Sequence, residues 1–170
     1  MRLTTLTFCL IFSCVTAMAQ HDHGGHSQYA DEKRSHIPSL TMAEYDELLS
    51  GGGMGFAKPA ELNRYPGPKH VLELADSLGL SSEQREQVER IRAKMAGRAI
   101  ELGREYVHSE HELNRLFADG NATEQAVVEQ TARVGDIRSA LRSTHLIAHV
   151  ETAAVLTKEQ IERYDRLRGY

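Results

Sequence analysis

Two long stretches with helical periodicity, joined by one turn, constrain the fold of this chain more than any other feature. From Ser81 to Phe117, apolar residues recur at spacings that keep them on one helix face, and the pattern returns from Thr123 to Val155. Asp119-Gly120-Asn121 interrupts the periodicity between the two stretches. The recurring residues are Val88, Ile91, Met95, Leu102, Tyr106, Leu113 and Leu116, then Val127, Val134, Ile137, Leu141, Ala148 and Val155. The sequence therefore predicts an antiparallel helical hairpin.

A bare hairpin buries only the seam between its two helices, so shorter helices must fold over it or a second copy must pack against it. Thr41 and Glu44 form a capping box that predicts a helix over residues 41–50. Pro68 opens a second predicted helix over 68–79, and a third follows over 158–167. The Gly- and Pro-rich residues between the first two form a connection with one short turn near Pro59–Leu62. The fold class is all-α.

One short pattern, Leu-Ser/Thr-x-x-Gln, occurs twice, within GLSSEQREQV and VLTKEQIERY. Its members are Leu80, Ser81 and Gln84 in the first copy and Leu156, Thr157 and Gln160 in the second. The Ser or Thr can cap a helix while the Gln three residues later reaches back to the N–H of the cap. In the second copy Leu156 and Ile161 can also form a hydrophobic staple. Each copy is expected to start a helix, with about 1 kcal/mol for each cap.

Residues 1–19 have the composition of a cleavable signal peptide. Arg2 precedes a short apolar run from Leu3 to Val15, and Ala17-Met18-Ala19 fits the small-x-small cleavage rule. Both cysteines of the chain, Cys9 and Cys14, lie in this segment. We therefore expect export to the periplasm without any thiol in the mature chain. The alternative is a lipoprotein anchored at Cys14, which the bulky Phe12 disfavours.

Residues 20–37 are polar, contain Gly and His, and lack apolar periodicity, which is typical of a disordered tail. The tail is expected to precede a helical domain over residues 38–170. His21, His23 and His26, with His36, could bind Cu(II), Ni(II) or Zn(II) weakly, because imidazole suits all three ions. The alternative is a soluble tail without a metal.

The charge balance and the motif content argue against two classes of function. Lys and Arg number 20 and Asp and Glu 24, for a formal net charge of -4, whereas nucleic-acid binding requires a basic excess. No P-loop, HExxH or nucleophile elbow occurs, so the chain is not expected to be an enzyme.

With its two Leu-Ser/Thr-x-x-Gln motifs after a signal peptide, the chain resembles the Spy/CpxP-like family of periplasmic proteins that share the LTxxQ motif. Residues 40–170 look like its heavy-metal-resistance branch, the periplasmic heavy-metal sensors. The resemblance implies a four-helix hooked hairpin, usually a homodimer, without catalytic activity. It also implies a role in heavy-metal resistance or sensing, by binding a metal, a partner protein such as a membrane sensor or anti-sigma factor, or both.

Counting back from the two motifs, the metal-binding positions of the sensor branch fall near Val71, Ala75, Ala148 and Thr152, none of which can bind a metal. A shifted site is possible, because His145 and His149 are four residues apart and share a helix face. We expect His70 to close over them, with Glu73 or Glu151 adding an oxygen ligand for Cu(II), Ni(II) or Zn(II). The alternative is that both histidines are polar residues beside the seam, bonded to neighbours such as Glu151.

Two further features bear on binding. His108 and His111 are expected to lie near the turn on solvated surface, on the order of 20 Å from His145. Basic residues along both long helices suit the second role known in the resembled family, a chaperone that binds unfolded periplasmic proteins in envelope stress. They are Arg85, Arg90, Arg92, Lys94, Arg98, Arg104, Arg133, Arg138 and Arg142. Interspersed acidic residues also fit an ion-paired solvated face.

Overall fold

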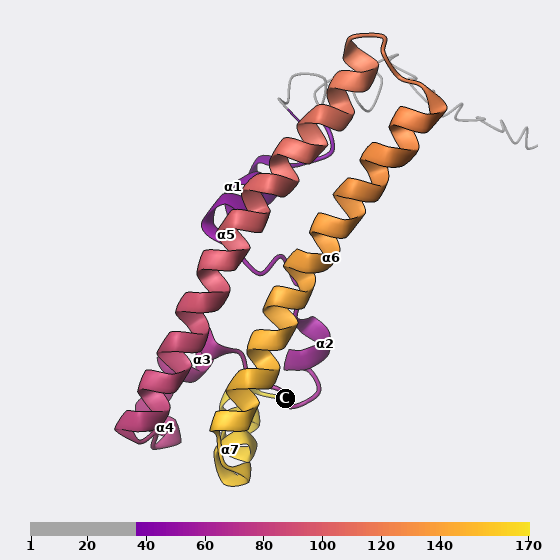
Figure 1. The fold of residues 1–170 in the computed structure, drawn as a ribbon. Coiled ribbons are helices and arrows are strands. Elements are labelled where there is room, and N and C mark those ends of the chain that lie inside the picture. Colours follow the sequence, from indigo (N-terminus) through magenta and orange to yellow (C-terminus); the bar gives the residue numbers. More distant parts are fainter. Residues whose placement is uncertain (1–36) are drawn as a thin grey trace, which may run out of the picture.

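A computed structural model of the protein describes residues 37–170. Helix α5 (Ser82–Ala118) and helix α6 (Glu124–Val155) run antiparallel along their whole lengths and form the predicted hairpin (Figure 1). The turn between them passes through Gly120, whose φ of 70° is left-handed and therefore suits glycine. The expected signal peptide and all but the last residue of the expected tail lie outside the described residues.

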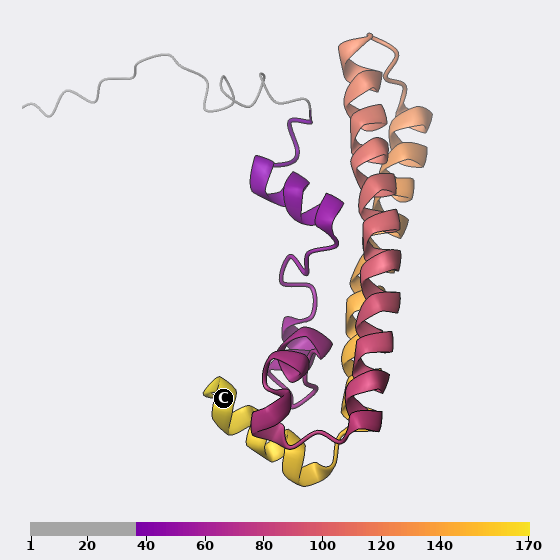
Figure 2. The ribbon, with the colours of Figure 1, turned by 90° about the vertical axis from the view of Figure 1, so that its left-hand side faces the viewer.

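The five shorter helices are α1 (Met42–Ser50), α2 (Lys58–Glu61), α3 (Pro68–Glu73), α4 (Ala75–Leu78) and α7 (Lys158–Arg168). Figure 2 shows α1 to α4 on one side of the hairpin, with α7 turned towards that same side, and the opposite side bare of any helix of residues 37–170. The all-α fold is confirmed. The helix predicted over 68–79 is divided, because Leu74 leaves the helical conformation with φ −102° and ψ 11°.

Three capping boxes start helices as the sequence predicts. Thr41, Ser81 and Thr157 each accept a hydrogen bond from the N–H three residues later, and Glu44, Gln84 and Gln160 bond back to the N–H of the cap. Thr123 caps α6 through its side chain alone. The expectation that both LTxxQ-like motifs begin helices is therefore confirmed.

The core divides into two apolar clusters on the covered side of the hairpin. The cluster nearer the turn contains Ile37, Leu40, Leu48, Ala99, Leu102, Tyr106, Ile137 and Leu141. The cluster at the open end contains Val71, Leu78, Val88, Leu156 and Tyr164. Leu156 and Ile161 belong to this second cluster, as the predicted staple requires. Ile37, which the expected boundary at residue 38 leaves in the tail, is buried in this core.

Gly103 sets how closely α1 approaches the hairpin. A Cβ at this position would collide with the carbonyl oxygen of Leu48 at the end of α1. Only glycine on α5 therefore permits this crossing. Within residues 37–170, no helix combines the length and the apolar character that a membrane span requires.

Candidate metal-binding site

The two histidines of α6 that share a helix face are both buried. His145 is 4% exposed and His149 is 8% exposed. They lie beneath the connection that joins α1 to α3, because His145 bonds to the backbone of Gly52 and His149 to that of Tyr65. The alternative, that both histidines are polar residues bonded to neighbouring groups, differs in its partner: Glu151 bonds to Lys94 at 2.9 Å, and the two rings bond to the backbone of the connection.

The backbone of the connection fixes the orientation of the His149 ring. Nδ1 of His149 lies 2.6 Å from the carbonyl oxygen of Tyr65, so this nitrogen carries the proton and donates it. The Glu61 carboxylate lies 3.6 Å from the same nitrogen. Gly67 packs against the Cε1–Nε2 edge of the ring, where a Cβ would meet Cε1 at 2.9 Å and Nε2 at 3.0 Å. Because Nδ1 carries the proton, the Nε2 atom of His149 keeps its lone pair.

His145 has the same arrangement at a more apolar position. Its Nε2 atom is buried without a hydrogen-bond partner, so its bond to the Gly52 backbone is made by Nδ1. The ring of Phe56 lies near, with centroids 6.2 Å apart. Burial lowers the pKa of His145, the positive charge of a protonated His149 lowers it further, and the bond to Gly52 opposes both. The imidazole is consequently neutral at neutral pH, with an unused lone pair on Nε2.

This pattern is the one that metal-binding histidines show. A ligating imidazole almost always donates its other N–H to a backbone carbonyl or a carboxylate, which fixes the tautomer and raises the basicity of the ligating nitrogen. Both His145 and His149 meet that condition through Nδ1. The orphaned Nε2 of His145 is moreover costly to leave unpaired. In ligand type, the two imidazoles therefore suit Cu(II), Ni(II) or Zn(II).

The other predicted ligands do not join this pair. His70 on α3 bonds through Nδ1 to its neighbour Glu73 at 2.8 Å, on a partly exposed surface. Over residues 37–170, no three His, Cys, Asp or Glu side chains gather closely enough to hold a metal ion. The predicted three-histidine site closed by His70 and Glu73 is therefore not formed, because the two side chains pair with each other. His21, His23 and His26 lie outside the described residues.

Sequence reasoning missed Glu61, whose carboxylate joins three elements. Its Oε1 atom accepts hydrogen bonds from the hydroxyls of Tyr164 at 2.5 Å and Tyr170 at 3.0 Å, and Nε of Arg168 lies 3.5 Å away. Its Oε2 atom is the one that faces His149. Burial and the bond to Glu61 raise the pKa of the Tyr164 phenol above its usual range. Residues 61 and 164 are 103 positions apart, so no local pattern indicates this contact.

His108 and His111 lie on exposed surface of α5, as predicted. Nδ1 of His111 is 3.6 Å from the Glu112 carboxylate. His108 makes no hydrogen bond or ion pair within the described part of the chain.

A family described as heavy-metal resistance matches residues 49–163, which include Glu61, His145, His149 and both LTxxQ-like motifs. No curated protein and no solved structure shows significant similarity to the chain. The family match covers more than half of the sequence and confirms the resemblance drawn from the motifs. The chain belongs to the heavy-metal-resistance family.

Proposed function

We propose that this protein is exported to the periplasm and acts in heavy-metal resistance by binding a divalent transition-metal ion at His145 and His149. Membership of the family supports a role in heavy-metal resistance, and the two buried imidazoles support His145 and His149 as the metal-binding residues. The single observation that carries the proposal is the buried Nε2 atom of His145, which has no partner while Nδ1 is held by the backbone.

In this proposal the two Nε2 atoms are the protein ligands. Two imidazoles do not complete the shell of Cu(II), Ni(II) or Zn(II), so water would supply the rest. The protein's own contribution is to orient both rings. Acceptor oxygens of Tyr65, Gly52 and Glu61 face the Nδ1 atoms, which leaves the Nε2 atoms to bind the ion.

Calorimetric titration of the mature chain with Cu(II), Ni(II) and Zn(II) tests the proposal. His145→Gln with His149→Gln should weaken the tightest binding at least tenfold, because outer partners alone typically account for about 10- to 100-fold. The matched control is His108→Gln with His111→Gln, which removes two exposed imidazoles and should leave that binding unchanged. Equal affinities for the two double variants would contradict the proposal.

Deleting residues 20–36 separates the folded site from the weak sites expected in the tail. A site at His145 and His149 should still bind the ion after the deletion. The number of ions bound per chain should be lower than in the undeleted chain, because the tail sites are gone. If all binding disappeared with the tail, the metal would belong to His21, His23 and His26, and the folded site would be refuted.

One observation favours a second candidate, the binding of unfolded proteins or of a second copy. The bare side of the hairpin carries two adjoining grooves of about 450 and 160 Å³ between α5 and α6. Both are lined by Ile91, Lys94 and Glu151, with Arg90 and Arg98 at the ends. An apolar groove with basic edges could hold an extended chain. Ile91→Glu should abolish suppression of client aggregation if this role is correct, whereas the His145 and His149 variants should retain it.

A further inference from the structure

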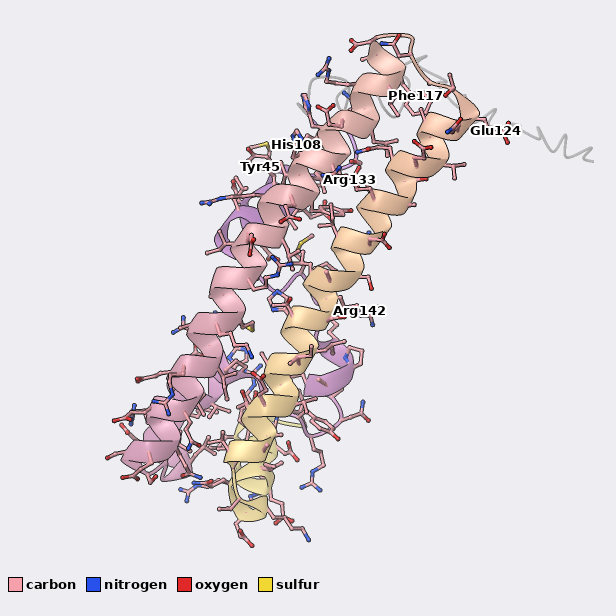
Figure 3. The ribbon with its side chains drawn as sticks, viewed as in Figure 1. Tyr45, His108, Phe117, Glu124, Arg133 and Arg142 are labelled. Atoms are coloured by element: carbon pink, nitrogen blue, oxygen red, sulfur yellow. The ribbon has the colours of Figure 1, made fainter. Side chains whose placement is uncertain are left out.

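A second concave site lies between α1 and the half of α5 nearer the turn. The cavity has a volume of about 500 Å³, within the range of about 300–1,000 Å³ typical of small-molecule sites. Its apolar lining is contributed mainly by the segment before α1, by α1 itself and by Val107 of α5. These residues are Ile37, Leu40, Met42, Tyr45, Leu49 and Val107. Figure 3 shows Tyr45 and His108 beside each other at this place.

The same cavity has a nitrogen-rich edge. Arg104, His108 and His111 lie three or four residues apart and form one stripe along α5. His111 is close to Glu112, but Arg104 and His108 make no hydrogen bond or ion pair within residues 37–170. An arginine guanidinium with all its donors free can bind a carboxylate through two parallel hydrogen bonds. The edge therefore selects for an anion.

The apolar part is incompletely covered by residues 37–170. Met42 is 71% exposed at the start of α1, and Tyr45 and Leu49 are only partly buried. A mostly apolar cavity with a few convergent polar groups is the usual form of a small-molecule site. A ligand that satisfies both parts must combine a flexible apolar body with one anionic end.

We propose that this cavity binds a free single-chain carboxylic acid of the fatty-acid class. The acyl chain lies against Leu40, Met42 and Tyr45, and the carboxylate meets Arg104 and His108. The site uses none of the residues assigned to metal binding, so it is a separate property of the fold. One acyl chain suits a cavity of about 500 Å³ better than a two-chain lipid does.

Calorimetry with the mature chain and a series of octanoate, decanoate and dodecanoate tests this proposal. Affinity should rise about tenfold for every two methylenes, because each buried methylene is removed from water. Dodecanol, which lacks the carboxylate, should bind at least tenfold more weakly than dodecanoate, because the charge-assisted bond to Arg104 is lost.

Two variants and one control locate the site. Arg104→Gln should weaken dodecanoate binding at least tenfold, whereas Arg133→Gln, an exposed arginine of α6, should leave it unchanged. Met42→Glu should also weaken dodecanoate binding at least tenfold. Because Met42 is largely exposed, the substitution should not disturb folding, so a loss of binding would reflect the cavity itself. Helical content of all three variants should equal that of the parent chain by circular dichroism.

Several outcomes would overturn the proposal. Affinity independent of chain length, or equal in Arg104→Gln and Arg133→Gln, would show that the cavity does not hold an acyl carboxylate. Binding that appears only after residues 20–36 are deleted would assign the cavity to the chain's own preceding segment. A concentration-dependent dimer that Met42→Glu dissociates, without any dodecanoate binding, would assign it to a second copy.

Discussion

Gln84 and Gln160, the glutamines of the two LTxxQ-like motifs, are hydrogen bonded to each other. Nε2 of Gln84 donates to Oε1 of Gln160 at 2.9 Å, and Nε2 of Gln160 donates to Oε1 of Gln84 at 3.0 Å. Each Oε1 atom also accepts from the N–H of its own cap, Ser81 or Thr157. Nε2 of Gln84 further donates to the carbonyl oxygen of Val155 at 2.9 Å. The motif thus joins the starts of α5 and α7 in addition to capping them.

This pairing explains why one chain carries the motif twice. A glutamine side chain has both a donor and an acceptor, so two copies can satisfy each other while both maintain a capping box. A glutamate at the same position would cap its helix but could not donate. The contact between the motifs therefore requires glutamine at both positions. The two glutamines lie 76 positions apart in sequence.

Replacing the paired glutamines tests the contact. Capping alone predicts that Gln160→Ala costs less than Thr157→Ala, which should cost about 1 kcal/mol. The pair reverses that order, and Gln160→Ala should cost about 2 kcal/mol because several bonds at a half-buried position are lost. The double variant with Gln84→Ala should cost about 1 kcal/mol less than the sum of the single variants. Urea unfolding measures all four values.

Gln125→Ala is the control for that series, because Gln125 bonds only to its exposed neighbour Glu129. It should change the free energy of unfolding by less than about 0.5 kcal/mol. Additive losses for Gln84→Ala and Gln160→Ala would show that the two side chains do not interact in solution.

Two glycines of α5 provide a matched test of how α1 packs. Gly103→Ala should destabilise the protein by about 2 kcal/mol or more, because its Cβ would collide with the Leu48 carbonyl. Gly97→Ala places a Cβ in open space on the same helix and should stabilise it by up to about 1 kcal/mol. Thermal unfolding checks both signs. Similar melting temperatures for the two variants would mean that α1 does not cross α5 at Gly103.

The contact between Glu61 and Tyr164 should stabilise the C-terminal helix. Tyr164 is 1% exposed, and Tyr164→Phe removes a hydrogen bond to a carboxylate, at a cost of about 2 kcal/mol in unfolding free energy. Tyr170→Phe is the control, since its hydroxyl bonds to the same oxygen from an exposed position. It should cost less than about 0.5 kcal/mol. Equal effects of the two variants would refute a buried role for Tyr164.

Protonation of His145 should destabilise the fold in weak acid. Burial lowers the folded-state pKa of His145 below 6.5, so the unfolded chain binds the proton more readily. At pH values above about 6.5, the pKa of histidine in the unfolded chain, His145 is neutral in both states and does not lower the free energy of unfolding. As the pH falls from that value through the folded pKa, the free energy of unfolding decreases, and the loss is complete below the folded pKa.

Chemical unfolding at several pH values between 7 and 4 measures this effect. His145→Gln should remove the part of the decline that begins near the unfolded pKa, whereas His111→Gln, at an exposed position, should leave the decline unchanged. The same slope in His145→Gln and in the parent chain would show that His145 does not titrate with a lowered pKa.

The parts of the fold that follow local rules could be predicted from the sequence. Caps at Thr41, Ser81 and Thr157 depend on residues three positions apart, and the two long helices on short-range periodicity, so both were visible. The break at Leu74 could not be seen, because no Pro or Gly marks it.

Only the part of the candidate site that depends on local spacing could be predicted from the sequence. The i, i+4 spacing of His145 and His149 places them on one face, whichever segment covers it. Their burial depends on where the connection over residues 51–67 lies, which no local pattern determines. The contacts of Glu61 with Tyr164 and of Gln84 with Gln160 likewise arise from tertiary packing. His70 was placed wrongly because Glu73, one helical turn away, is a nearer partner than the α6 histidines.

The nitrogen resonances of the imidazole rings test the central claim most directly. Long-range ¹H–¹⁵N correlation spectra of the mature chain report which ring nitrogen carries the proton and which nitrogen binds an added ion. The account predicts that His145 and His149 carry the proton on Nδ1 and that one equivalent of Zn(II) shifts both Nε2 resonances, while His108 and His111 stay unchanged. Unshifted Nε2 resonances of His145 and His149 in the presence of bound Zn(II) would contradict it.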